Sequence, residues 1–351
     1  MQRPWAHAIA VMILAAGPAH AQQPPRDEPT RSNLWFVRAG YSPAVVLATT
    51  RFESDDDHAR GMTIEIGRQT DGTRDWHRVY NYPSYGMGFY VGRFGRDREL
   101  GRPLAAYGFF SWPFPIANRF QVTSDLGLGV TWRWNEFHPE SNPTNTAMGS
   151  DIAYHVDWGL YFHYLANPRT SMFTGLNVTH WSNGGTKLPN LGLAVVGPKV
   201  GVRYNLAPQV ARPRARAEDL PRFSPTWEFV AGGAGSPRSG ATAAFNVTTG
   251  IQRQFYRFGT VAAGADATRD GQISVGVYAG YEHVMARFTV LAQFGQTVWR
   301  EFEDPDLPRF YQRYGSRFYL TDHLWSTFAV RTVKLRRARF VEFGVGYRAR
   351  W

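Results

Sequence analysis

The chain has 351 residues, a formal net charge of +11, 15% aromatic residues and no cysteine. The lack of cysteine excludes disulfides, thiolate metal sites and cysteine nucleophiles. A basic chain can indicate a nucleic-acid partner, but the export signal described next argues against one. Anionic lipid headgroups suit an exported basic protein better.

The first residues read as a secretion signal. Arg3 supplies a positive start, residues 8–16 are apolar, and Ala19-His20-Ala21 forms an A-x-A cleavage site. The apolar run is too short to span a membrane as a helix. We therefore predict a cleaved signal peptide over residues 1–21, followed by a flexible, proline-rich leader over 22–33.

From residue 34 onward, apolar and polar residues alternate with a period of two. In residues 151–165, for example, Tyr154, Val156 and Trp158 share one face, and His155 and Asp157 share the other. A soluble β-sandwich also alternates, but these segments are long enough to cross a membrane at a tilt, and aromatic residues gather near their ends. The pattern predicts an all-β fold, an antiparallel transmembrane β-barrel.

Sixteen segments show this alternation, and we expect one closed barrel of about 12–16 strands over residues 34–351. Residues 207–224 are rich in proline and arginine and divide the barrel into halves 34–206 and 225–351, as a long periplasmic turn or as a seam between subdomains. The candidate strands lie near 34–48, 61–68, 84–93, 104–114, 120–134, 151–165, 171–182, 195–206, 225–235, 242–254, 256–267, 272–281, 284–298, 310–320, 323–334 and 339–351.

The last strand ends in Trp351, an arrangement that resembles the sorting signal of outer-membrane barrels. We therefore expect the outer membrane of a Gram-negative bacterium. With a periplasmic N-terminus, strand direction alternates, and the loops near 49–60, 94–103, 135–150, 183–194, 299–309 and 335–338 face outward.

One strand carries residues suited to catalysis. In residues 171–182, His180 and Ser182 lie two apart and share a face with Met172, Leu176 and Val178, which is the lipid-facing side. A histidine can activate a serine hydroxyl, and a tetrahedral intermediate then needs hydrogen-bond donors. Asn183 and the backbone amides of Gly184 and Gly185 could supply them. The alternative is that His-x-Ser occurs by chance and that Ser-Asn-Gly-Gly is an ordinary turn.

The segment H-W-S-N-G-G-T-K-L-P-N-L-G, residues 180–192, resembles the signature of the PagL-type lipid A 3-O-deacylases and of the longer barrels called acyloxyacyl hydrolases. Looser similarity extends to residues 82–86 and 145–150. The resemblance implies an outer-membrane serine esterase that acts on lipid A of lipopolysaccharide without a cofactor. It also implies His180 as base, Ser182 as nucleophile, and Asn183, Gly184 and Gly185 at the oxyanion hole.

The chain departs from this family at one position. The short deacylases place a glutamate fourteen residues after the histidine, and Ala194 stands there in this sequence. The acid that would orient His180 is therefore missing or comes from elsewhere. Asp151, Asp157, Glu228 and Glu342 are the candidates, although the alternation points Asp157 and Glu342 into the lumen.

Two basic loops could bind the phosphates of lipid A, because arginine suits phosphate recognition. The residues concerned are Arg93, Arg96 and Arg98 in one loop and Arg336 and Arg337 in the other. Solubilising surface charge is the alternative. For the whole chain, two other functions stay open: a channel with a polar lumen, and a structural barrel that has lost activity. No metal site is predicted.

Overall fold

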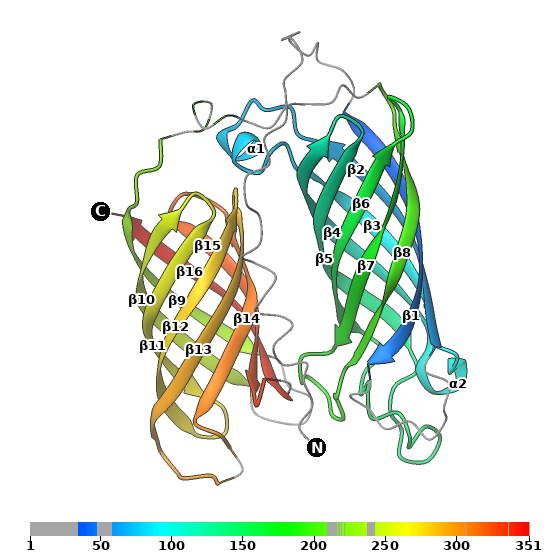
Figure 1. Ribbon diagram of the computed structural model, residues 1–351. Coiled ribbons are helices and arrows are strands. Elements are labelled where there is room, and N and C mark those ends of the chain that lie inside the picture. Colours follow the sequence, from blue (N-terminus) through cyan, green and yellow to red (C-terminus); the bar gives the residue numbers. More distant parts are fainter. Residues whose placement is uncertain are drawn as a thin grey trace, which may run out of the picture.

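The computed structural model describes residues 34–47, 58–208, 216, 218, 220, 222–236, 243–305, 307–335 and 337–350. These residues form sixteen antiparallel strands and two short helices (Figure 1). The predicted signal peptide and the leader up to residue 33 lie outside this part of the chain. None of the described helices is long and apolar enough to span a membrane.

The first eight strands close on themselves, since β8 pairs with β1 and places Asn205 opposite Phe36. The short helix α1 (Asp75–Val79) follows β2, and α2 (Asp97–Leu100) follows β3. The strands are β1 (Trp35–Leu47), β2 (His58–Gln69), β3 (Ser84–Arg93), β4 (Gly101–Ala117), β5 (Phe120–Trp134), β6 (Ala153–Leu165), β7 (Thr170–Ser182) and β8 (Leu193–Asn205).

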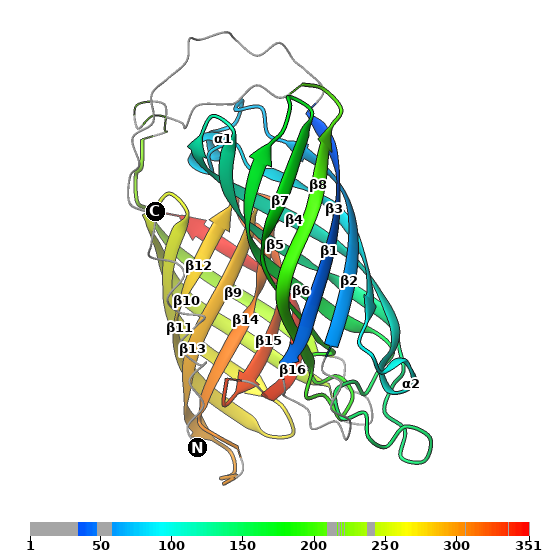
Figure 2. The same ribbon diagram turned by 45° about the vertical axis from the view of Figure 1, so that its right-hand side comes forward.

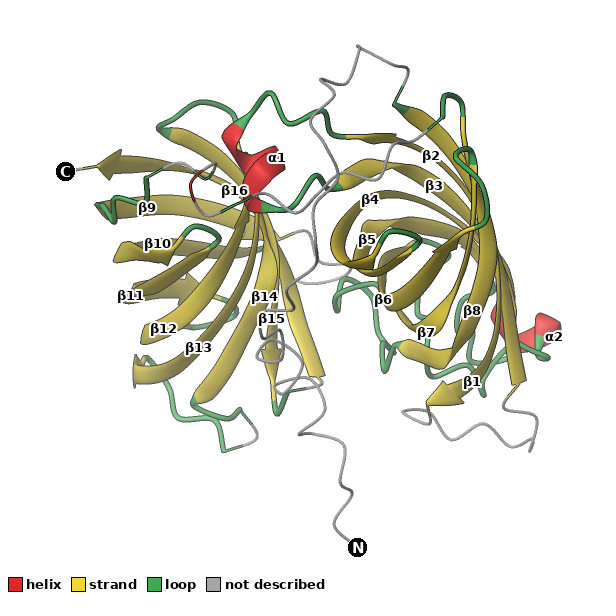
Figure 3. Cartoon of the chain, turned by 45° about the horizontal axis from the view of Figure 1, so that its top comes forward, coloured by secondary structure: helices red, strands yellow, loops and turns green. Residues whose placement is uncertain are grey.

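The last eight strands close a second barrel, in which β16 pairs with β9 and places Phe343 opposite Gly235. The strands are β9 (Trp227–Ser236), β10 (Ala244–Tyr256), β11 (Gly259–Arg269), β12 (Ile273–Met285), β13 (Phe288–Arg300), β14 (Phe310–Tyr319), β15 (Leu324–Val333) and β16 (Arg337–Arg350). Figure 3 shows the two rings of strands side by side.

The predicted class, an all-β antiparallel barrel fold, is confirmed, and the sixteen described strands agree with the expected 12–16. The expectation of a single closed barrel is wrong, because the strands form two barrels of eight. Eight tilted strands enclose an interior that side chains can just fill, so each half of the chain can close alone. The alternation fixes which face of a strand is apolar. It does not say whether the eighth strand pairs with the first strand or with the ninth.

Both barrels carry apolar residues outside and polar residues inside. On β2, the outward side chains of Met62, Ile64 and Ile66 are 52–64% exposed, whereas Thr63 and Glu65 between them are buried. This inverts the pattern of a soluble protein and is the pattern of a barrel whose outer surface contacts lipid.

Charged side chains fill the two lumens. In the first barrel, Arg38 forms ion pairs with Glu65 and Asp125, and the Tyr107 hydroxyl donates to Glu65 over 2.6 Å. In the second barrel, Arg313 pairs with Asp266 at 3.0 Å and with Glu342 at 2.7 Å. These buried pairs satisfy one another's charge, as buried charges must.

The barrels touch at both ends. On the side of α1, the Tyr80 hydroxyl donates to the backbone carbonyl of Val284 over 2.6 Å and lies 3.0 Å from His283 Nε2. At the other end, the ring of Tyr154 on β6 lies 4.6 Å from that of Phe328 on β15. Figure 2 shows the second barrel beside β5 and β6 of the first. The two barrels are therefore in contact close to the end of β7.

Candidate active site

β7 carries His180 and Ser182 on the outer face of the first barrel. Asn177, Thr179 and Trp181 point inward and are buried, whereas His180 is exposed and Ser182 is half-buried. The side chains therefore lie as the period of two predicts, next to each other on the outside wall. A substrate held in the membrane would reach them without entering a lumen.

The Ser182 hydroxyl is held by the loop that follows it. Asn190 Nδ2 donates to Ser182 Oγ over 3.0 Å, and the backbone amide of Gly184 donates to the same oxygen over 3.1 Å. Gly184 and Gly185 have φ angles of +69° and +85°, which glycine adopts without strain. Two donors therefore converge on the oxygen that would become the nucleophile.

Asn190 lies within the sequence motif, but the motif alone assigns it no role. Its side chain contacts Ser182 only because the loop folds back: Asn190 Oδ1 also accepts from the backbone amide of Asn183 over 3.0 Å. The P-N-x-G part of the signature was the signal that could have identified this residue.

The predicted oxyanion donors are already bonded inside the loop. Asn183 is buried, and its Nδ2 donates to Ser150 Oγ over 3.1 Å and to the Lys187 carbonyl over 2.8 Å. The Gly185 amide donates to Asn183 Oδ1 over 2.9 Å. The side chain of Asn183 thus shapes the turn, and the structure places the Gly184 amide and Asn190 nearer to the reacting oxygen.

The imidazole of His180 lies over Gly192. A Cβ added at Gly192 would come within 2.9 Å of His180 Cε1 and 3.4 Å of Nε2, and the φ angle of Gly192 is +71°. Glycine therefore leaves the room that the ring occupies. Within the described residues, Ser182 Oγ bonds to Asn190 and Gly184 and not to the imidazole.

Ala194 is the register partner of His180 across the β7–β8 pair. None of the four candidate acids makes a described contact with the imidazole. Asp157 bonds to Asn177 and Thr179 inside the first barrel, and Glu342 pairs with Arg313 inside the second. Glu228 is also buried in the second lumen, and Asp151 is exposed before β6.

A second loop, residues 145–150, packs against residues 183–192, the motif loop. Asn145 is fully buried and donates to the backbone carbonyls of Glu99 and Asn135. The backbone amides of Leu191 and Gly192 donate to the carbonyls of Thr146 and Ala147, each over 3.2 Å. The loose similarity at residues 145–150 therefore corresponds to the floor of the candidate site.

The predicted phosphate-binding arginines are spread widely. Arg93 and Arg98 are exposed and Arg96 is buried, and all three lie at the β3–β4 connection. Since β3 and β7 are separated by three strands on either side of the ring, this connection is across the first barrel from Ser182. Arg337 is exposed at the start of β16, near the motif loop, and Arg336 lies outside the described residues.

Among the described residues, no group of three histidine, aspartate or glutamate side chains is placed to hold a metal ion. The chemistry that the described groups offer is that of a hydroxyl nucleophile, an imidazole base and two N–H donors.

Comparison with protein families matches both halves of the chain. Residues 61–203 match the family described as lipid A 3-O-deacylase (PagL). Residues 222–351 match the family described as acyloxyacyl hydrolase, C-terminal domain. The chain belongs to the PagL-type family of outer-membrane barrels. The two matched segments correspond to the two barrels, so the longer members' C-terminal domain is here a closed barrel of its own.

Two solved structures each resemble about half of this chain. Neisserial surface protein A is 11% identical over 49% of this chain and 97% of its own, with a TM-score of 0.33. The outer membrane enzyme PagL is 17% identical over 49% of this chain and 99% of its own, with a TM-score of 0.31. A search of curated proteins found no match.

Proposed function

We propose that this protein is a serine esterase of the outer membrane that hydrolyses an ester-linked acyl chain of lipid A, the 3-O-linked chain. The observation that carries the proposal is the convergence of Asn190 Nδ2 and the Gly184 amide on Ser182 Oγ, beside His180 on the outside wall. The PagL-type family supports the substrate class.

In the proposed reaction, His180 takes the proton of Ser182 as Oγ attacks the carbonyl carbon of the ester. A change of the His180 rotamer would bring the imidazole to Oγ, since the two residues share a face of the strand. The carbonyl oxygen becomes an oxyanion, and Asn190 Nδ2 and the Gly184 amide, released from Oγ, would donate to it. Collapse expels the sugar oxygen, which takes the proton from His180.

The second half returns the enzyme to its starting state. His180 takes a proton from water, the hydroxide attacks the acyl-serine, and the fatty acid leaves as Ser182 Oγ regains the proton. No redox step, metal or cofactor is needed. His180 must be neutral to begin each half, and histidine meets this condition near neutral pH.

The lumens argue against the alternative of a channel. Arg38 with Glu65 and Asp125 crosses the first lumen, and Arg313 with Asp266 and Glu342 crosses the second. These charged groups, which a channel would expose to water, are bonded to one another here. His180 and Ser182, in contrast, lie on the outer wall of the first barrel and not in a lumen.

The position of the site at one end of the first barrel supports this substrate. Residues 183–194 lie at the same end as the β3–β4 connection with α2, opposite the end that carries α1 (Figure 1). If the α1 end is periplasmic, the site is level with the outer leaflet, where lipid A resides. Removal of residues 1–21 during export is part of the same proposal.

Mass spectrometry of lipid A tests the proposal. Lipid A from Gram-negative cells that produce the protein should lose the mass of one primary acyl chain, and the released fatty acid should be the 3-O-linked one. Unchanged lipid A in cells whose outer membrane contains the folded protein would refute the proposal. Ion conductance across planar bilayers, with lipid A intact, would favour the channel instead.

A further inference from the structure

We propose that the outer end of β16 in the second barrel is a positioning wall for the active site, with Val341 as the positioning residue. The inference rests on the proposed function, because it assigns a task to the second barrel in the reaction at Ser182. The second barrel would then be part of the enzyme, and the esterase site would be incomplete without it.

The motif loop packs directly on β16. A Cβ added at Gly184 would lie 2.2 Å from Val341 Cγ1, and one added at Gly185 would lie 3.1 Å from the carbonyl oxygens of Ala338 and Arg339. Both glycines therefore abut the second barrel, and no larger residue fits at Gly184. The loop that holds Ser182 Oγ is pressed between the two barrels.

Val341 is unusual among the outward residues of its strand. Its neighbours Phe340 and Glu342 are buried in the second lumen, so Val341 points outward, yet none of its surface is exposed. Val345, four residues further along the same face, is 66% exposed. The two side chains differ in exposure because the first barrel covers Val341, whereas Val345 faces the lipid.

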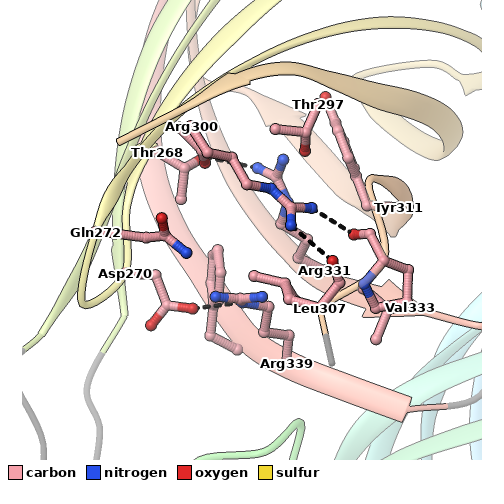
Figure 4. A pocket seen from close by; sticks show the side chains of 13 residues that line it. Thr268, Asp270, Gln272, Thr297, Arg300, Leu307, Tyr311, Arg331, Val333 and Arg339 are labelled. Carbon is pink, nitrogen blue, oxygen red and sulfur yellow. Dashed lines mark hydrogen bonds and ion pairs between the residues drawn. The ribbon is translucent and has the colours of Figure 1, made fainter. Parts of the chain in front are cut away.

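A β-bulge fixes this part of β16. Arg331 of β15 pairs with Phe340 and Thr332 pairs with Ala338, so Arg339 is the extra, unpaired residue. A bulge re-aims a side chain and bends its strand. Arg339 here points into the mouth of the second barrel and forms an ion pair with Asp270 (Figure 4). Its backbone carbonyl faces Gly185.

The mouth into which Arg339 points is a small hollow, lined among others by Asp270, Arg300 and Arg331. The Arg339–Asp270 pair anchors the bulge from the inside, because the side chain of Asp270 is only 4% exposed. A chain of contacts thus runs from Asp270 through Arg339 to Gly185 and, through Val341, to Gly184. Only the last of these residues bonds to Ser182.

The chemical consequence concerns the Gly184 amide. Two consecutive glycines with positive φ angles have more conformational freedom than any other pair of residues. The packing on Val341 removes that freedom and holds the amide beside Ser182 Oγ, within reach of the oxyanion that would form there. Donors that are oriented in advance cost no reorganisation during the reaction.

The test compares Val341→Ala with Val345→Ala, a matched change on the same strand and face. Each full-length protein is folded into detergent micelles, its folded fraction is measured by heat-modifiable gel migration, and fatty acid release from purified lipid A is measured per folded molecule. Val341→Ala should lower kcat about tenfold to a hundredfold, the scale on which a misplacement of about 1 Å acts. KM and the pH profile should stay unchanged, because substrate binding and the His180 base are not altered.

Two further variants complete the design. Val341→Ile, which keeps both Cγ atoms, should retain more activity than Val341→Ala, because the surface on which Gly184 packs is preserved. Asp270→Asn weakens the ion pair with Arg339 without changing a residue at the contact between the two barrels. This variant should also lower kcat. If Val341→Ala does not fold, Asp270→Asn decides the question by the same measurement.

The experiment distinguishes a failure of the proposed function from a failure of the positioning role. If the wild-type protein releases no fatty acid from lipid A, the proposed function is wrong and the positioning role falls with it. If the wild type is active and both Val341→Ala and Asp270→Asn match it per folded molecule, the esterase stands and the positioning wall is refuted. Equal losses in Val341→Ala and Val345→Ala would likewise refute it, because they would show a general effect of shortening β16.

Discussion

Ala194 of β8 lies directly opposite His180 of β7, and both residues face the outer surface of the first barrel. Directly opposed residues of an antiparallel pair have Cβ atoms about 4.5–5.5 Å apart, so a longer side chain at position 194 would reach the imidazole. No carboxylate among the four candidate acids makes a described contact with His180. Within the described part of the chain, the proposed base His180 therefore has no described carboxylate partner that would fix its tautomer.

Replacing Ala194 by glutamate should raise activity. A carboxylate next to the imidazole fixes its tautomer and stabilises the imidazolium, an effect worth about 10⁴ in kcat in serine proteases. We expect a gain of at least about tenfold in kcat of Ala194→Glu, a fraction of that full effect, measured as fatty acid released per folded molecule. Ala194→Gln, which has the same shape without the charge, should give no gain. A rate for Ala194→Glu at or below that of the wild type would show that another group already orients His180.

The hydrogen bond from Asn190 Nδ2 to Ser182 Oγ predicts a catalytic loss when Asn190 is changed. Asn190→Ala should lower kcat by about 10²–10³, the cost of removing one oxyanion donor, with little change in KM. Asn167→Ala is the control, because Asn167 lies in the β6–β7 turn at the other end of the barrel. If Asn190→Ala kept full activity and Asn183→Ala lost it, the donor would be Asn183 as the motif alone suggested.

The sequence predicts the strands and the outward direction of the site, because both depend on local patterns. The expected segments 84–93 and 120–134 coincide with β3 and β5, and the parity of residues 171–182 places His180 and Ser182 outside. Alternation is visible within each strand, and turn residues mark its ends.

What the sequence does not predict depends on contacts between distant segments. Closure of the first barrel joins Phe36 to Asn205, and nothing local distinguishes that pairing from continuation into β9. The contact of Asn190 with Ser182 depends on the loop folding back on itself. The packing of Val341 on Gly184 depends on how two separate barrels dock.

The position of Arg337 near the motif loop predicts that it, and not Arg98, contributes to binding of phosphorylated lipid A. Arg337→Ala should raise KM for lipid A about fivefold, since one exposed cation near an anionic lipid surface contributes about 1 kcal/mol. The KM for dephosphorylated lipid A should not change. Arg98→Ala is the control across the barrel. Equal shifts for both substrates would mean that Arg337 is only surface charge.

Tyr80 predicts a contribution of the α1 side to stability. The Tyr80 hydroxyl donates to the Val284 carbonyl over 2.6 Å, so Tyr80→Phe leaves that acceptor without its partner. The free energy of unfolding in urea should fall by about 1 kcal/mol, the net contribution of a typical hydrogen bond, because this bond is only partly buried. Tyr41→Phe, at an exposed position on β1, should change it little. No difference between the two variants would mean that water replaces the Tyr80 bond.

Ser182 is the residue on which the esterase account depends most directly. Ser182→Ala should fold and insert as the wild type does, because the change is small and lies at a strand end on the surface. The decisive measurement is the lipid A mass spectrum of cells that produce equal amounts of folded wild-type or Ser182→Ala protein. The account predicts lipid A without one primary acyl chain in the first case and fully acylated lipid A in the second. Deacylation by Ser182→Ala at the wild-type rate would contradict it.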